Sequence, residues 1–224
     1  MLSLALLALL PVSTAHFVLT WPTNRGFDDA KSTNFPCGGF DSVKTPRTDF
    51  PLTGGPIQLD MHHTQTNIEV LLSIGSDPGS NYNLVLRRTF AQEGLGDFCA
   101  GEVSIPAGLN ITSGTLATIQ VVSNGDPDGG LYQCADVTLV DTPLSTADYN
   151  SHCKNGTGVK VTSENIQGNP NETTTETTPS ASSSGTGTGT GTASSSTSTP
   201  GLAVHATAAS WLFGAVGVAG LALL

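Results

Sequence analysis

The chain has few basic residues: 8 Lys and Arg stand against 18 Asp and Glu among its 224 residues, for a formal net charge of −10 at pH 7. It contains no basic run, which counts against nucleic acid as a partner. Aromatic residues make up only 6%, and this shortage counts against a flat binding face for crystalline cellulose or chitin. No stretch shows a long helical period, so an all-helical fold is excluded.

Long apolar runs occur only at the two ends. Residues 2–10 form a run of signal-peptide length that Pro11 ends, and Ser13-Thr14-Ala15 supplies the small residues that signal peptidase requires. The run is too short to cross a bilayer, which takes about 20 residues. We therefore predict a signal peptide over 1–15, whose removal leaves His16 as the mature N-terminus.

The C-terminal run, residues 211–224, is apolar and uncharged. A polar spacer over 198–210 and the tiny residues of 193–196 precede it. A small acceptor, a spacer and an apolar tail together predict a glycosylphosphatidylinositol (GPI) signal. We predict that 197–224 is removed and that Ser194 or Ser195 carries the lipid. The protein is then expected at the cell surface, on the outer leaflet of the plasma membrane or in the cell wall.

Between these ends, a folded domain and a stalk are predicted. Residues 16–165 have the size of one domain. Residues 166–196 are rich in Ser, Thr and Gly and bury too little apolar surface to offset chain entropy, so we predict an O-glycosylated stalk. Asn-x-Thr sequons at Asn110, Asn155 and Asn171 fit N-glycosylation on a secretory route.

Short strand signals separated by Gly and Pro turns recur along the domain. They lie at residues 57–61, 68–74, 82–86, 117–122 and 131–139, and residues 124–130 join the last two as a hairpin loop. This pattern predicts an all-β fold, an antiparallel β-sandwich. The four cysteines predict two disulfides in an oxidising compartment, with three connectivities possible: Cys37, Cys99, Cys134 and Cys153.

His16 is the most informative residue for chemistry. Once freed by cleavage, it offers its α-amine and its imidazole Nδ1, which together form a chelate ring on one metal ion. A second imidazole would complete a T-shaped set of three nitrogens, a donor set that suits Cu(II). The adjacent His62 and His63, between two strand signals, could supply that ring or could be ordinary surface histidines. Adjacent residues of an extended segment point oppositely, so one of the two at most is expected to bind.

Several motifs together resemble the fungal copper acquisition factor-like family, relatives of lytic polysaccharide monooxygenases that keep a histidine brace. They begin with the segment from His16 to Pro22, then Arg25-Gly26-Phe27 and Pro36-Cys37-Gly38-Gly39. The likeness continues through His63-Thr64 and the segments 96–99, 117–121 and 131–136. It covers nearly the whole predicted domain.

This resemblance implies an immunoglobulin-like sandwich that binds one Cu(II) per chain. The implied ligands are His16, His63 and the carboxylate of Asp136, with His62 and Asp97 as alternates. The implied disulfides are Cys37–Cys134 and Cys99–Cys153. True polysaccharide monooxygenases often set a Tyr near the metal, but the place of Tyr132 in a strand, two residues before Cys134, favours a core position.

Three functions fit the sequence. The first is a monomeric, non-enzymatic copper binder for copper uptake, homeostasis or cell-wall interaction, with wall polysaccharide or a copper transporter as a further partner. The second is a copper-dependent monooxygenase that cleaves polysaccharide. The third is a structural wall glycoprotein in which His16 is accidental. We expect the first.

Overall fold

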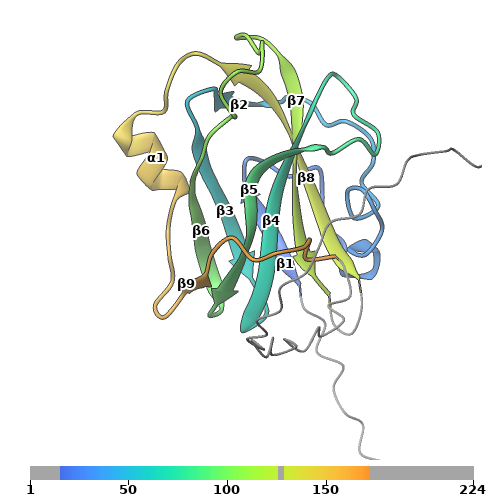
Figure 1. The fold of residues 1–224 in the computed structure, drawn as a ribbon, viewed down its shortest axis with the longest axis vertical. Coiled ribbons are helices and arrows are strands. Elements are labelled where there is room, and N and C mark those ends of the chain that lie inside the picture. Colours follow the sequence, from blue (N-terminus) through green and yellow to red (C-terminus); the bar gives the residue numbers. More distant parts are fainter. Residues whose placement is uncertain (1–15, 126–128, 172–224) are drawn as a thin grey trace, which may run out of the picture. The chain divides into compact units, whose positions relative to one another are not determined.

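The computed structural model describes residues 16–125 and 129–171 (Figure 1). The predicted signal peptide, most of the predicted stalk, Ser194, Ser195 and the GPI tail lie outside these residues, as does part of the 124–130 loop. The chain divides into two compact units, Met1–Thr177 and Thr178–Leu224, and all described residues belong to the first. Within the described ranges, no helix is long and apolar enough to cross a membrane.

The described residues form two β-sheets. The three-stranded sheet has the order β1-β3-β6, made of β1 (Phe17–Trp21), β3 (Gly55–Met61) and β6 (Gly96–Val103). The six-stranded sheet has the order β2-β8-β7-β4-β5-β9, made of β2 (Thr48–Pro51), β8 (Gly130–Val140), β7 (Leu116–Asn124), β4 (Gln65–Ile74), β5 (Leu84–Glu93) and β9 (Lys160–Ser163). A 3-10 helix, η1 (Asp29–Lys31), and a short helix, α1 (Thr146–His152), complete the fold.

One apolar core lies between the sheets. Alternate residues of each strand face it, because successive side chains of a strand point to opposite faces. In β3, Leu59 and Met61 are buried, whereas the Asp60 side chain is 44% exposed. Ile68 of β4 and Ile119 of β7 meet this face from the other sheet. The predicted all-β sandwich is confirmed.

Two elements differ from the prediction. β2 pairs in parallel with β8, with Phe50 opposite Leu139, so the larger sheet is mixed rather than purely antiparallel. A parallel neighbour needs a long connection, and the chain between these two strands, which runs through β3 to β7, supplies one. The helix α1 was also not predicted, because its seven residues are too few to show a helical period. It lies beside the sandwich, away from β8 (Figure 1).

Two disulfides fasten the connecting segments to the sheets. Cys37–Cys134 ties the long loop to β8, and Cys99–Cys153 ties the end of α1 to β6. Both pairings implied by the family resemblance are confirmed. The Tyr82 hydroxyl lies 3.3 Å from the Cys37 sulfur, and burial raises the pKa of Tyr82 to about 12.

Candidate metal centre

His16 lies directly before β1, at one end of the smaller sheet. Its carbonyl oxygen accepts a hydrogen bond from the amide of His62 at 2.9 Å. This bond extends the pairing of β1 with β3 by one step beyond Phe17 and Met61. The turn that carries both neighbouring histidines therefore lies next to His16.

The His16 side chain is largely buried by the long loop. It is 9% exposed, and its Nε2 lies 3.6 Å from a carboxylate oxygen of Asp29. Its ring stands edge-on to Phe27, with 6.2 Å between the ring centroids. In a neutral ring, a carboxylate beside Nε2 favours the proton on that nitrogen, which leaves the lone pair on Nδ1.

His63 lies in the turn between β3 and β4. Its Nδ1 is 2.7 Å from the carbonyl oxygen of Gln65, and a carbonyl can only accept, so Nδ1 carries a proton. In the neutral ring, Nε2 then holds the lone pair. Metal-ligating histidines usually donate their other N–H to a carbonyl or carboxylate in this way. His63 thus presents one nitrogen suited to a metal.

His62 has a different environment. Its Nε2 is 3.2 Å from a carboxylate oxygen of Asp60, and both side chains are nearly half exposed. Asp60 is also opposite Asp97 in the pairing of β3 with β6, and Asp97 is exposed. These residues belong to the outer face of the smaller sheet, whereas His63 lines a hollow with residues of β4 and β5 such as Gln92.

Asp136 lies in the middle of β8, with its side chain only 1% exposed. Its carboxylate accepts hydrogen bonds from Arg25 Nε at 2.9 Å and Arg25 Nη2 at 2.8 Å. It also accepts from the Thr118 hydroxyl and the Lys44 amide, each at 2.7 Å. These contacts occupy both carboxylate oxygens and leave no exposed surface for an ion.

The location of Asp136 agrees with a structural role. Gln133, three residues earlier in β8, contacts the backbone of β1 at Phe17 and Leu19. Three steps along a strand reverse the face of the sheet, so Asp136 is directed away from β1. The structure places Asp136 with Arg25, on the face of β8 away from β1, and the metal-ligand assignment of Asp136 stays a prediction.

The Arg25–Asp136 pair stays ionised despite its burial. Burial alone would raise the pKa of Asp136, but the hydrogen bonds from Arg25, the Lys44 amide and Thr118 outweigh it and hold this pKa below its ordinary value. Burial alone would lower the pKa of Arg25, but the hydrogen bond and charge of Asp136 keep it raised. The pair fixes the long loop to β8.

Within 16–125 and 129–171, no group of three or more His, Cys, Asp and Glu side chains is placed to hold a metal ion. A histidine brace needs only two side chains, since its third donor is the α-amine of the first residue. In the full chain this nitrogen is an amide bonded to Ala15. The donors present fit Cu(II) in kind, provided that residues 1–15 are removed.

Two carboxylates near these histidines were not predicted. Asp60 is two residues before His62 on a strand, so alternation alone would have placed both on one face. Asp29 reaches His16 from η1, a contact that depends on the path of the long loop and has no signal in the sequence.

Comparison with known proteins bears on the chemistry. A family model described as copper acquisition factor BIM1-like matches residues 14–158. An uncharacterized protein of Aspergillus fumigatus is 44% identical over 177 residues, covering 75% of this chain and 72% of that protein. Copper acquisition factor BIM1 of Cryptococcus neoformans is 35% identical over 136 residues, 57% of this chain and 61% of that protein. Lytic polysaccharide monooxygenase-like protein X325 of Yarrowia lipolytica is 31% identical over 189 residues, covering 75% of this chain and 69% of that protein.

The family match spans well over half of the chain. His16, the His62-His63 turn and all four cysteines fall inside the matched residues. The chain spans less than two thirds of the BIM1 protein it matches. The resemblance noted in the sequence is confirmed, and with it a copper-related function. The chain belongs to the family of BIM1-like copper acquisition factor domains.

Proposed function

We propose that the processed protein binds one copper ion at its N-terminus, through the α-amine and Nδ1 of His16 and through Nε2 of His63. The observation that carries the proposal is the 2.9 Å hydrogen bond between the His62 amide and the His16 carbonyl. It holds the turn that carries His63 beside the chain position that cleavage would turn into an amine.

The polar neighbours of the two rings support this choice of nitrogens. The Gln65 carbonyl takes the Nδ1 proton of His63, and Asp29 lies beside Nε2 of His16. Each ring therefore keeps its lone pair on the nitrogen that a brace requires. Imidazole and amine nitrogens suit Cu(II) and must be deprotonated to bind it.

We further propose that the site serves copper uptake or homeostasis at the cell surface, not polysaccharide cleavage. Trp21 is 7% exposed and stacks on His152, so it offers no platform to a polysaccharide. Phe35 is the only exposed large aromatic side chain among the described residues. A surface with one exposed ring does not fit a flat crystalline substrate. A copper transporter, or wall polysaccharide near the lipid anchor, is the proposed partner.

The decisive experiment compares two forms of the protein. One begins at His16, and the other carries a single Ala before His16. We expect Cu(II) titration to show one site in the first form and an affinity lower by orders of magnitude in the second, because an amide nitrogen is not a ready ligand. Equal affinities would mean that the amine does not ligate, and the proposal would fail.

The names of relatives such as the X325 protein motivate a monooxygenase as the second candidate. Copper-loaded protein mixed with a reductant, peroxide and polysaccharides distinguishes the two. We expect no oxidised oligosaccharides by mass spectrometry. Their appearance, and their loss in His63→Ala, would favour the enzyme.

A further inference from the structure

A C-terminal strap, defined as residues 164–171, crosses the outer face of the larger sheet. The Ile166 amide donates to the Thr89 carbonyl, and the Thr89 hydroxyl donates to the Gly168 carbonyl, each at 2.8 Å. Pro170 is buried. These contacts carry the chain from β5 to the beginning of β8, where Asn171 is the last described residue.

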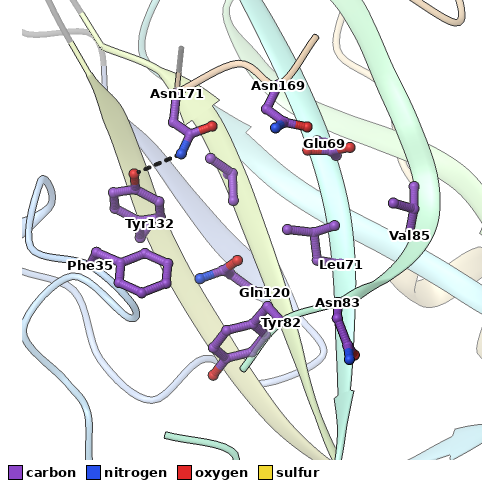
Figure 2. A pocket seen from close by; sticks show the side chains of 11 residues that line it. Phe35, Glu69, Leu71, Tyr82, Asn83, Val85, Gln120, Tyr132, Asn169 and Asn171 are labelled. Carbon is purple, nitrogen blue, oxygen red and sulfur yellow. Dashed lines mark hydrogen bonds between the residues drawn. The ribbon is translucent and has the colours of Figure 1, made fainter. Parts of the chain in front are cut away.

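The strap borders a pocket of about 270 Å³ on this face (Figure 2). The side chains that matter for its chemistry are three aromatic rings, two amides and one carboxylate: Phe35, Tyr82, Tyr132, Asn83, Gln120 and Glu69. None of its described lining residues is Lys or Arg, so the pocket has no charge complementary to an anion. Rings and planar amides suit a neutral ligand that has both apolar and hydrogen-bonding faces.

Two of the rings form a prepared surface. Phe35 is 51% exposed and stands edge-on to Tyr132, with 5.3 Å between the ring centroids. Tyr132 is buried, as expected, but beneath Phe35 on the outer face and not in the core between the sheets. Tyr132 is therefore buried as predicted, next to the main cluster of core residues and not within it. Because Tyr132 already supports the Phe35 ring, a ligand can stack on Phe35 without first restricting the motion of that ring.

Asn171 is seated at the edge of this pocket. Its Nδ2 donates to the Tyr132 hydroxyl at 3.3 Å and points from the strap towards the pocket (Figure 2). Asn171 can take this position because residue 130 is glycine. A Cβ on residue 130 would lie 2.6 Å from Asn171 Cβ and 2.7 Å from the Tyr132 hydroxyl oxygen. Any other residue at this position would displace Asn171 or Tyr132.

Nδ2 is the atom to which an N-linked sugar is attached, and Asn171-Glu172-Thr173 is a sequon. We propose that this pocket holds the inner sugars of an N-linked glycan on Asn171. Transfer from a lipid pyrophosphate donor breaks the bond between sugar C1 and the phosphate oxygen and joins C1 to Nδ2, with the lipid pyrophosphate as leaving group and loss of one amide proton. The remaining N–H can still donate to Tyr132.

The chemistry of the inner sugars matches the lining. The C–H face of a sugar ring packs on Phe35. The hydroxyl and acetamido groups find donors and acceptors in the side-chain amides of Gln120 and Asn83. The inference rests on the secretory route of the proposed function and is independent of copper.

The other two sequons provide controls. Asn110 is exposed, and Asn155 is exposed with its Oδ1 accepting from the Cys99 amide at 2.8 Å. Neither lines this pocket. Glycans on these two residues show how readily the enzyme releases a glycan that no pocket holds.

The test is the release of glycans by a peptide-N-glycosidase from the secreted, folded protein, followed at each site by glycopeptide mass spectrometry. Each rate is divided by that of the heat-unfolded protein. We expect release at Asn171 to be about tenfold slower than at Asn155, the effect of one ring stack and its hydrogen bonds. Phe35→Ala is expected to raise the Asn171 rate to that of Asn155.

Thermal unfolding gives a second measurement. Thr173→Ala removes the Asn171 glycan and keeps the Asn side chain, and it should lower Tm, whereas Thr157→Ala, which removes the Asn155 glycan, should not. Copper affinity should be unchanged in both variants, so failure here is separate from failure of the brace. Three results would each overturn the inference. They are the absence of a glycan on Asn171, equal normalised release rates at Asn171 and Asn155, and an empty pocket that instead binds free chito-oligosaccharide.

Discussion

At the scale of single residues, two adjacent histidines have different hydrogen bonds. His62 contacts the carboxylate of Asp60 on the outer face of the smaller sheet, and His63 contacts the Gln65 carbonyl. Only the second arrangement fixes Nδ1–H and frees Nε2, the nitrogen that the proposed site uses. This difference in environment supports the choice of His63 over His62 in the proposed site.

Substitution of these histidines tests the assignment. We expect His63→Ala to lower Cu(II) affinity more than about 100-fold, since changes outside the ligand shell alone cost about 10–100-fold. His62→Ala should retain affinity within a few-fold. Isothermal titration against a competing chelator measures both, with far-UV circular dichroism as the control for folding. A larger loss in His62→Ala would reverse the assignment.

Asp136→Asn tests the structural role given to this carboxylate. The variant leaves the buried Arg25 guanidinium without its counter-charge, so we expect the free energy of unfolding to fall by about 3–5 kcal/mol. Urea denaturation measures this. Copper affinity of the folded variant should match that of the wild type. A folded variant that no longer binds copper would support Asp136 as a ligand.

The same pair predicts how stability depends on pH. The pKa of Asp136 is lower in the folded protein than its ordinary value near 3.9. Its contribution is therefore fully present above that ordinary value and is lost as the pH falls through the folded-state pKa. The difference in unfolding free energy between wild type and Asp136→Asn should be constant from pH 7 to 5 and shrink below about pH 4. Urea titrations at several pH values test this, and a difference that grows in acid would contradict it.

At the scale of elements, strands with a clear pattern were predictable and the others were not. β4, β7 and β8 are long and rich in branched apolar residues, and each was predicted within a few residues of its ends. β6 was missed because two glycines and two acids interrupt its apolar pattern. β2 has only four residues, too few for a period to appear.

The candidate site was predictable in part for a similar reason. His16 and the His62-His63 pair follow from local motifs. Their proximity depends on the register between β1 and β3, which no local pattern encodes. The pairing of Asp136 with Arg25 was not predicted, because Arg25 is 111 residues away in the chain and a short motif around Asp136 cannot show that contact.

The segment after α1 is held to the smaller sheet by a covalent bond and by one side chain. Cys99–Cys153 fastens it to β6. The Gln58 side chain donates from Nε2 to the Lys154 carbonyl at 3.0 Å. Its Oε1 accepts from the backbone N–H of Lys154 at 2.8 Å. The helix and its connection are thus anchored on the outer face, away from the proposed metal ligands.

Removing this disulfide should therefore affect stability and not the metal. For the double variant Cys99→Ala/Cys153→Ala we expect a loss of about 2–5 kcal/mol in the free energy of unfolding. Guanidinium denaturation measures the loss. Copper titration of the folded protein serves as the control, and a changed copper affinity would show that this segment supports the metal site.

At the scale of the whole molecule, metal binding should be coupled to folding. The proposed ligands come from the N-terminus and from the turn after β3, which unfolding would separate. Free copper at 100 times Kd should then add about 2.7 kcal/mol to the free energy of unfolding. We expect copper to raise Tm for protein that begins at His16 and not for protein with one added residue. Equal shifts in both forms would indicate binding elsewhere.

The backbone nitrogen of His16 remains an amide for as long as Ala15 precedes it. On the proposed assignment, a precursor still inside the cell has both imidazoles but lacks the donor that closes the chelate, so it competes poorly for cytosolic copper. Hydrolysis of one peptide bond during export would then both release the polypeptide and create the amine that completes its copper site. Metal capture would thereby be confined to the far side of the membrane, without any regulatory subunit.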